Sequence, residues 1–203
     1  MYHKAKKHFK KVDKILHKAS MEFEIENLAP SKDLFEDIVW TIIGQQLSGR
    51  AADTIFERFR KLFPKGKVSA KKIIALSDET MRGRGLSGAK ARALKSLSEH
   101  IISGQLKLKE LEKLSDADVT TALTAVKGIG PWTAQMILMF SLARPDIFSK
   151  GDLGLRKGFM ALYKMKNPPS EKKMDSVTIL WSPYRTYAAK VLWRVADKAK
   201  EKK

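Results

Sequence analysis

Residues 123–136 read LTAVKGIGPWTAQM, and they contain the turn that decides the fold. The turn itself is Lys127-Gly128-Ile129-Gly130. Pro131 follows at the first position of the next helix, which suits proline because an N–H at that position would have no partner within the helix. Glycine lacks a Cβ, so another backbone or a phosphate can come close to such a turn. The stretch therefore predicts two helices joined by a tight hairpin.

The hairpin has two interpretations. The amides of Gly128, Gly130 and Thr133 lie at a helix N-terminus, where the helix dipole favours an anion. The same pattern also fits an ordinary turn between two helices that begins with proline. The turn alone supports both interpretations equally.

The composition favours an anionic partner. The 203 residues include 40 Lys and Arg against 22 Asp and Glu, giving a formal charge of +18. Such an excess attracts nucleic acid or an acidic membrane surface. No stretch reaches 18 apolar residues, which argues against a membrane span. With this charge, the anion at the hairpin is expected to be a nucleic-acid phosphate.

Cysteine is absent from the sequence. This excludes disulfides, thiolate zinc sites, cysteine-ligated iron–sulfur clusters and a cysteine nucleophile. A chain without disulfides needs no oxidising compartment, and the basic N-terminus lacks the apolar segment of a secretory signal. We therefore expect the protein in the cytoplasm or nucleoid. The four histidines have no metal-binding spacing with carboxylates.

Helical periodicity runs through the whole sequence, which predicts an all-α protein of about ten short helices. A first helix is expected to carry Phe9 and Ala19 on one apolar face. Ser31 and Ser48 are expected to cap the second and third helices. The last helix is expected to start at Ser182-Pro183.

Residues 126–158 (VKGIGPWTAQMILMFSLARPDIFSKGDLGLRKG) resemble the helix–hairpin–helix (HhH-GPD) DNA glycosylase superfamily. Within it, the sequence is most similar to the alkyladenine branch, that of bacterial 3-methyladenine DNA glycosylase II and its yeast counterparts. Three further stretches agree with that branch, in the same order along the chain: residues 42–48, residues 85–87, and residues 181–188 with Trp193. The resemblance covers roughly residues 30–195.

The resemblance implies a two-lobed helical fold with the active site in the cleft between the lobes. Residues 32–142 would form a central lobe that carries a wedge loop and the hairpin. Residues 1–31 and 143–203 would form the other lobe, which carries the catalytic aspartate. The implied function is base excision repair of alkylation damage in double-stranded DNA.

Asp152 is the catalytic candidate. In the family, this aspartate faces C1′ of a nucleotide flipped out of the duplex. A carboxylate there stabilises the positive charge that develops on the sugar as the N-glycosidic bond breaks, and it can orient or deprotonate the attacking water. Asp152 also precedes Leu153 in a position suited to a helix N-cap, and both roles are compatible. Asp146 is a weaker rival, expected in a turn.

Trp132 occupies the position at which some relatives carry a lysine that attacks C1′ and then cleaves the strand. The resemblance therefore implies a monofunctional glycosylase that uses water as nucleophile. Lys150 lies two residues before Asp152, so a bifunctional glycosylase/lyase remains an alternative. A non-enzymatic helix–hairpin–helix DNA-binding module is the second alternative.

The family's base pocket corresponds to Trp132, Met136 and Trp193. An electron-rich indole attracts cationic purines such as 3-methyladenine and 7-methylguanine. Core packing is the competing interpretation for Met136 and Trp193. Hypoxanthine, ethenoadenine and uracil remain open as further substrates.

The DNA-binding candidates come from two loops and the hairpin. Base flipping leaves a gap in the duplex that a wedge side chain can fill. The resemblance places Gln46 at the tip of that wedge, with Leu47 as the second choice, and Ser48 beside them is also a DNA-binding candidate. A polar loop capped by Ser48 is the alternative. The other candidates are Lys90 or Arg84 beside the glycine-rich loop, and Lys127, Gly128, Gly130 and Thr133 at the hairpin.

No cofactor is expected to be required. The resemblance implies one structural Na⁺ or K⁺ ion at the hairpin, held by the backbone carbonyls of Thr124, Val126 and Gly128. We expect a monomer whose partner is double-stranded DNA with alkylated bases.

Overall fold

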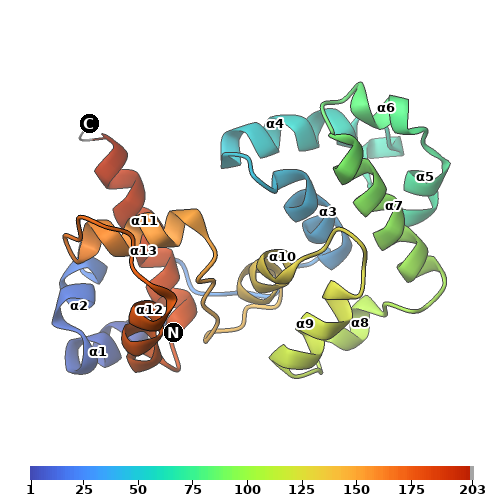
Figure 1. The fold of residues 1–203 in the computed structure, drawn as a ribbon. Coiled ribbons are helices and arrows are strands. Elements are labelled where there is room, and N and C mark those ends of the chain that lie inside the picture. Colours follow the sequence, from blue (N-terminus) through green and yellow to red (C-terminus); the bar gives the residue numbers. More distant parts are fainter. Residues whose placement is uncertain (202–203) are drawn as a thin grey trace. The chain divides into compact units, whose positions relative to one another are not determined.

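The computed structural model describes residues 1–201, and within that range it contains helices and no strands (Figure 1). The predicted all-α class is confirmed. The chain divides into two compact units. Unit 1 combines Met1–Pro30 with Ala143–Lys203, and unit 2 is Ser31–Leu142.

Unit 2 carries the hairpin. Its long helices, α3, α4 and α7, pack around side chains that are fully buried, among them Ile38, Ile42, Phe59 and Leu94. Its elements are α3 (Leu34–Gly44), α4 (Gly49–Arg60), η1 (Pro64–Gly66), α5 (Ala70–Ala75), α6 (Asp78–Arg82), α7 (Gly88–Ile102), α8 (Leu108–Leu111), α9 (Asp116–Thr124), α10 (Pro131–Met136) and η2 (Ile137–Ser141). The helix expected after Pro131 is therefore α-helical only to Met136, because η2 is a π-helix.

Unit 1 is built on α13, against which α11 and α2 pack. Its fully buried side chains include Phe9, Leu16, Phe159, Trp181 and Tyr187. Its elements are α1 (Tyr2–Val12), α2 (Lys14–Ser20), α11 (Leu153–Leu162), α12 (Glu171–Thr178), η3 (Ile179–Trp181) and α13 (Arg185–Glu201).

The prediction of one continuous first helix is wrong, because Asp13 divides it into α1 and α2. Asp13 has an extended backbone, and its Oδ1 accepts hydrogen bonds from the amides of Ile15 and Leu16, which starts a new helix. Its Oδ2 accepts from Trp181 Nε1 at 2.9 Å and from the Tyr163 hydroxyl. A buried partner on another segment thus decides where the helix breaks.

Two helices also begin at other residues than predicted. Asp33, not Ser31, caps α3, because its carboxylate accepts from the amide of Glu36 while the Ser31 hydroxyl accepts from the amide of Asp33. The last helix begins at Arg185 rather than Ser182. The prediction for Ser48 is confirmed, because its hydroxyl caps α4.

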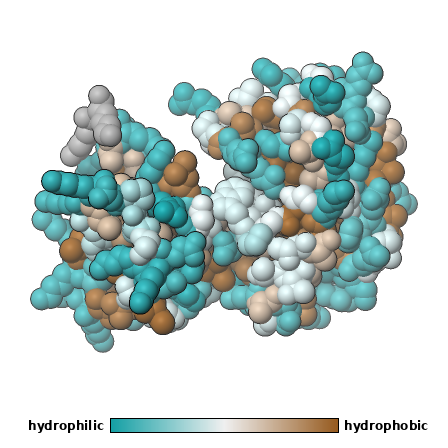
Figure 2. All heavy atoms as spheres, viewed as in Figure 1, coloured by the Kyte–Doolittle hydropathy of each residue, from teal (hydrophilic) through white to brown (hydrophobic). Residues whose placement is uncertain are grey.

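Hydrophilic residues cover much of the visible surface of both units (Figure 2). This distribution matches the high content of charged residues, 31% of the sequence. Among the described residues, no helix has the length and apolar content needed to cross a membrane.

Candidate functional site

Asp152 lies at the N-terminus of α11, and its position is fixed by two hydrogen bonds to one carboxylate oxygen. Oδ1 accepts from the amide of Leu155 at 2.7 Å and from Trp193 Nε1 at 2.9 Å. The expectation that Asp152 caps a helix is confirmed. Its side chain is only partly buried. The indole of α13 therefore holds in place an ionisable group that solvent can still reach.

Two glycines of α11 allow this arrangement. A Cβ on Gly154 would lie 2.8 Å from Trp193 Cδ1 and 3.0 Å from Asp152 Oδ1. A Cβ on Gly158 would lie 2.1 Å from the carbonyl oxygen of Leu192. Sequence reasoning missed both residues, although their i, i+4 spacing places them on one face of α11 and was visible.

Two neighbours of Asp152 in the sequence are already bound elsewhere. Lys150 Nζ forms an ion pair with Asp175 at 3.0 Å. Asp146, the rival candidate, accepts bonds from Ser182 Oγ at 2.7 Å and Arg185 Nε at 2.8 Å. Burial of Asp146 opposes its ionisation, but the bonds from Arg185 and Ser182 outweigh burial and hold the pKa of its carboxyl below the usual range. Asp146 thus anchors the start of α13.

In unit 2, Gln45 ties the loop after α3 to the hairpin. Its Nε2 donates to the carbonyl oxygen of Gly128 at 3.1 Å and to Thr133 Oγ1 at 3.0 Å. The next residue, Gln46, is exposed and has a φ of 59°, a left-handed conformation that costs a non-glycine residue free energy. Leu47 is also exposed. The two wedge candidates therefore project from a loop that is held at its base.

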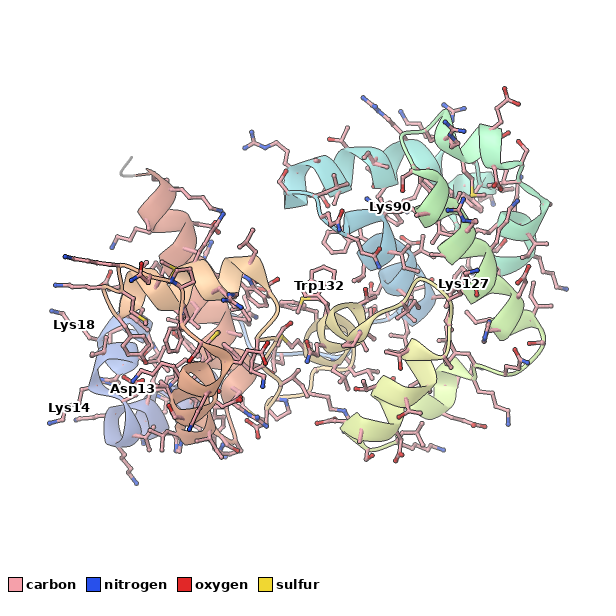
Figure 3. All side chains as sticks on the ribbon, viewed as in Figure 1. Asp13, Lys14, Lys18, Lys90, Lys127 and Trp132 are labelled. Atoms are coloured by element: carbon pink, nitrogen blue, oxygen red, sulfur yellow. The ribbon has the colours of Figure 1, made fainter. Side chains whose placement is uncertain are left out.

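Lys90 holds the same loop from the side of α7 (Figure 3). Its Nζ donates to the carbonyl oxygen of Ile43 at 2.7 Å, and burial lowers the pKa of its ammonium. The neighbouring carbonyls of Ile42 and Gly44 accept from backbone amides of the loop. Lys90 thus satisfies a carbonyl at the C-terminal end of α3, where a positive charge is also favoured by the helix dipole.

The hairpin packs closely against α7. Gly128 has a φ of +94°, and a Cβ there would lie 2.4 Å from the Cβ of Ala93. The Thr133 side chain is buried and serves as the acceptor for Gln45, whereas Lys127 is exposed. No side chain caps the N-terminus of α10. The glycine turn is thus required by packing as well as by its conformation.

The proposed ion ligands belong to the same turn. The Val126 carbonyl accepts from the amide of Ile129 at 3.0 Å, and the Gly128 carbonyl accepts from Gln45. A carbonyl oxygen has two lone pairs, so each can still accept one further interaction. Carbonyl oxygens are the ligands that hard cations prefer, so the Val126 and Gly128 carbonyls suit a Na⁺ or K⁺ ion chemically, and the ion itself stays a prediction.

The three base-pocket candidates differ in exposure. Met136 is buried at 7% exposure, which supports the core-packing interpretation for that residue. Trp132 on α10 and Trp193 on α13 are both partly exposed (Figure 3 labels Trp132). The expectation that the active site lies in the cleft between the two lobes stays a prediction. Among residues 1–201, no group of three or more His, Cys, Asp and Glu side chains could hold a metal ion.

Comparisons with known proteins give a consistent result. The family described as "HhH-GPD superfamily base excision DNA repair protein" matches residues 39–183. DNA-3-methyladenine glycosylase 1 of Schizosaccharomyces pombe is 36% identical over 83% of this chain and 75% of its own length.

Two solved structures are similar over most of their length. That of the S. pombe 3-methyladenine DNA glycosylase, in complex with abasic DNA, has a TM-score of 0.86 at 33% identity and covers 94% of this chain and 95% of its own. That of a DNA-3-methyladenine glycosidase from Bacillus halodurans has a TM-score of 0.80 at 34% identity, covering 96% and 89%.

Proposed function

Because the chain belongs to the HhH-GPD superfamily of base excision DNA repair proteins, we propose that it is a monofunctional DNA glycosylase for alkylated purines in double-stranded DNA. The reaction is hydrolysis of the N-glycosidic bond. Water adds its oxygen to C1′ of the deoxyribose and loses a proton to Asp152 or solvent, and the cationic purine leaves as a neutral base with the electron pair of the broken bond. The products are a free base and an abasic site in an intact strand.

The position of Asp152 is the observation that carries this proposal. The carboxylate is held by the Leu155 amide and the Trp193 indole before any substrate binds. A charge that is already oriented stabilises the cationic sugar of the transition state without the cost of reorganising solvent. Asp152 also accepts a proton from, or orients, the attacking water. The same charge problem is solved by carboxylates in glycoside hydrolysis.

A lyase reaction is disfavoured by two features of this chain. Trp132, not lysine, occupies the position from which some superfamily members supply an amine nucleophile. Lys150, which lies two residues before Asp152, forms an ion pair with Asp175. With no amine assigned to attack C1′, water is the nucleophile and the strand is not cleaved.

The partly exposed indoles of Trp132 and Trp193 support a preference for cationic bases. Both 3-methyladenine and 7-methylguanine carry positive charge, and an indole face attracts such a ring by about 1–2 kcal/mol when water is excluded. Their glycosidic bonds are already weakened by the charge, so little acid catalysis is needed. Met136 contributes packing behind Trp132, one helical turn away.

The DNA contacts come from unit 2. Gln46, with Leu47 second, fills the gap that a flipped nucleotide leaves. The hairpin residues Lys127, Gly128, Gly130 and Thr133 bind the DNA backbone, with a Na⁺ or K⁺ ion held by the carbonyls of Thr124, Val126 and Gly128. The protein acts as a monomer, inside the cell, on double-stranded DNA.

The test is release of 3-methyladenine and 7-methylguanine from methylated duplex DNA under single-turnover conditions. Asp152→Asn keeps an Oδ1 that can cap α11, so we expect the variant to bind DNA while its release rate falls by about 10²–10³-fold. Lys150→Gln is the matched control and is expected to release base at the parent rate. Release at the parent rate by Asp152→Asn would refute the catalytic assignment. A borohydride-trapped protein–DNA adduct would refute monofunctional hydrolysis.

A further inference from the structure

The first two helices carry a marked excess of positive charge. Residues 1–20 contain seven lysines and one acidic residue, Asp13. The Asp13 carboxylate is used internally, because it caps α2 and accepts bonds from Tyr163 and Trp181. Six of the lysines are exposed, and we refer to them together as the α1–α2 lysine face: Lys4, Lys7, Lys10, Lys11, Lys14 and Lys18.

The charges of this face have no internal partners. None of its six lysines forms an ion pair with another residue in the range 1–201. Several other surface lysines do: Lys95 pairs with Asp78, and Lys198 pairs with Glu22. The six ammonium groups are therefore not engaged in ion pairs within the described chain.

The face belongs to ordered helices. The N-terminal amine and the Tyr2 amide both donate to Asn27 Oδ1, at 2.7 Å and 2.8 Å. The Tyr2 hydroxyl donates to the Ser20 carbonyl at 2.8 Å, and burial raises the pKa of Tyr2 to about 12. Figure 3 shows Lys14 and Lys18 pointing away from α2 on the same side. The charges are thus presented by a fixed scaffold.

This arrangement has a cost within the helices. Lys7 and Lys11, and likewise Lys14 and Lys18, are four residues apart, a spacing at which like charges repel. The first turn of α1 has no acidic residue to complement the helix dipole. A polyanion bound across the face would remove both penalties.

The spacing suits a phosphate backbone. Lys4, Lys7 and Lys11 share one side of α1, and a helix rises 1.5 Å per residue, so they span about 10.5 Å. Duplex DNA presents one phosphate per 3.4 Å of axis on each strand, so this stripe matches the axial length of about three phosphates.

We propose that the α1–α2 lysine face binds the phosphate backbone of duplex DNA away from the damaged nucleotide, without reading sequence. The choice of DNA as the polyanion rests on the proposed function. The face adds to the hold on undamaged DNA and takes no part in bond cleavage. An anionic membrane would need the same charges, and binding to anionic vesicles separates that partner from DNA.

The test compares two sets of five substitutions that remove the same charge. The face variant changes Lys4, Lys7, Lys11, Lys14 and Lys18 to Gln. The control variant changes five exposed lysines that are scattered along the sequence and form no ion pair with another described residue, namely Lys32, Lys71, Lys109, Lys113 and Lys172. The dissociation constant for an undamaged duplex is measured over a range of salt concentrations. Each lost phosphate contact is expected to reduce the slope of log affinity against log salt by about 0.9.

We expect the slope of the face variant to fall by at least about 2, which corresponds to two or more lost phosphate contacts. The slope of the control variant is expected to change by less than about 0.9, the value for one contact. Equal slopes in all three proteins, or equal losses in both variants, would overturn the proposal. A face variant that loses binding to phosphatidylserine vesicles but keeps the parent DNA slope would overturn it in favour of a membrane. Circular dichroism verifies that each variant is folded.

The same experiment separates this proposal from the proposed function. At saturating protein, single-turnover base release by the face variant is expected to equal that of the parent, because no substituted residue belongs to the catalytic machinery. If the parent releases no alkylated base, the proposed function fails, and the salt slopes still decide whether the face binds DNA.

Discussion

The surroundings of Asp152 in unit 1 and the loop around Gln46 in unit 2 are held in place by different means. Asp152 depends on the close approach of α11 to α13, where Gly154 and Gly158 leave no space for a Cβ. The loop depends on two long side chains: Gln45 reaches from the loop to the hairpin, and Lys90 reaches from α7 to the end of α3. The first is a packing constraint and the second is a pair of polar anchors.

This difference predicts different responses to substitution. Atoms added to a close-packed helix contact have nowhere to go, because protein interiors are as dense as organic crystals. A polar anchor can be removed at the cost of one or two hydrogen bonds, and the rest of the unit remains folded. We therefore expect steep losses of stability in the first region and graded losses in the second.

The largest effect is expected for Gly158→Ala. Its Cβ would lie 2.1 Å from the Leu192 carbonyl oxygen, so α11 and α13 must separate. Overpacking of this kind costs about 3 kcal/mol. Thermal or urea unfolding measures the loss. Gly151→Ala is the control, because nothing lies within 4 Å of its added Cβ. Equal stability of the two variants would show that the helix contact is not the rigid part of unit 1.

Lys90→Met is expected to have an intermediate effect. The substitution keeps most of the apolar stem but leaves the Ile43 carbonyl without the donor it has in the structure. Loss of a hydrogen bond from a charged group costs about 2 kcal/mol. Lys71→Met, on an exposed position, is the matched control and should be neutral in urea unfolding.

A second measurement links Lys90 to the loop itself. If Lys90 and Gln45 hold the same loop, the losses in Lys90→Met and Gln45→Leu will not add in the double variant, and the coupling free energy will be about 0.5 kcal/mol or more. Strict additivity would mean that the two anchors act independently.

Trp193→Phe is expected to have a smaller effect, and it tests the polar part of the Asp152 region. Phenylalanine preserves an aromatic ring against α11 but removes the N–H that donates to Asp152 Oδ1. The Leu155 amide still caps through the same oxygen, so stability should fall by only about 1 kcal/mol. If Asp152 is catalytic, single-turnover base release should fall by about tenfold. An unchanged release rate would show that the indole does not position the carboxylate.

The features that could be predicted from sequence are local. The hairpin with Pro131 at its helix start, the Ser48 cap and the Asp152 cap each depend on residues within one helical turn, where the preference of a side chain for a backbone amide decides the structure. The resemblance to a known family then indicated which of these local features belong to a site.

The contacts that could not be predicted join distant residues. Gln45 is 83 residues from Gly128, and Lys90 is 47 residues from Ile43. From the sequence, Lys90 was expected to be a surface lysine that binds a phosphate. The residues next to it in the sequence do not indicate that it donates to a carbonyl of α3. The break at Asp13 was missed for the same reason, since its partners Tyr163 and Trp181 come more than a hundred residues later.

Unit 1 also contains a polar anchor, like those that hold the loop of unit 2, and acid is expected to weaken it. Asp146 binds Arg185 and Ser182 at the start of α13, and although burial opposes ionisation, these bonds lower the pKa of its carboxyl. An aspartate with a lowered pKa in the folded state contributes stability that is fully present above its unfolded pKa of about 3.9. That contribution is lost as pH falls through the lower folded value, because between the two pKa values the unfolded chain binds more protons than the folded one.

Asp146→Asn should therefore unfold more readily than the parent at neutral pH, with the difference shrinking below about pH 4. Urea unfolding of both proteins across the acid range measures this difference. The effect should be the smallest of the four, because the ion pair is partly exposed to solvent. A difference that stays constant with pH would mean that Asp146 acts through hydrogen-bond geometry alone. The charge of Asp146 would then add nothing to unit 1, and its contacts would act through hydrogen bonds alone, as those of Gln45 do in unit 2.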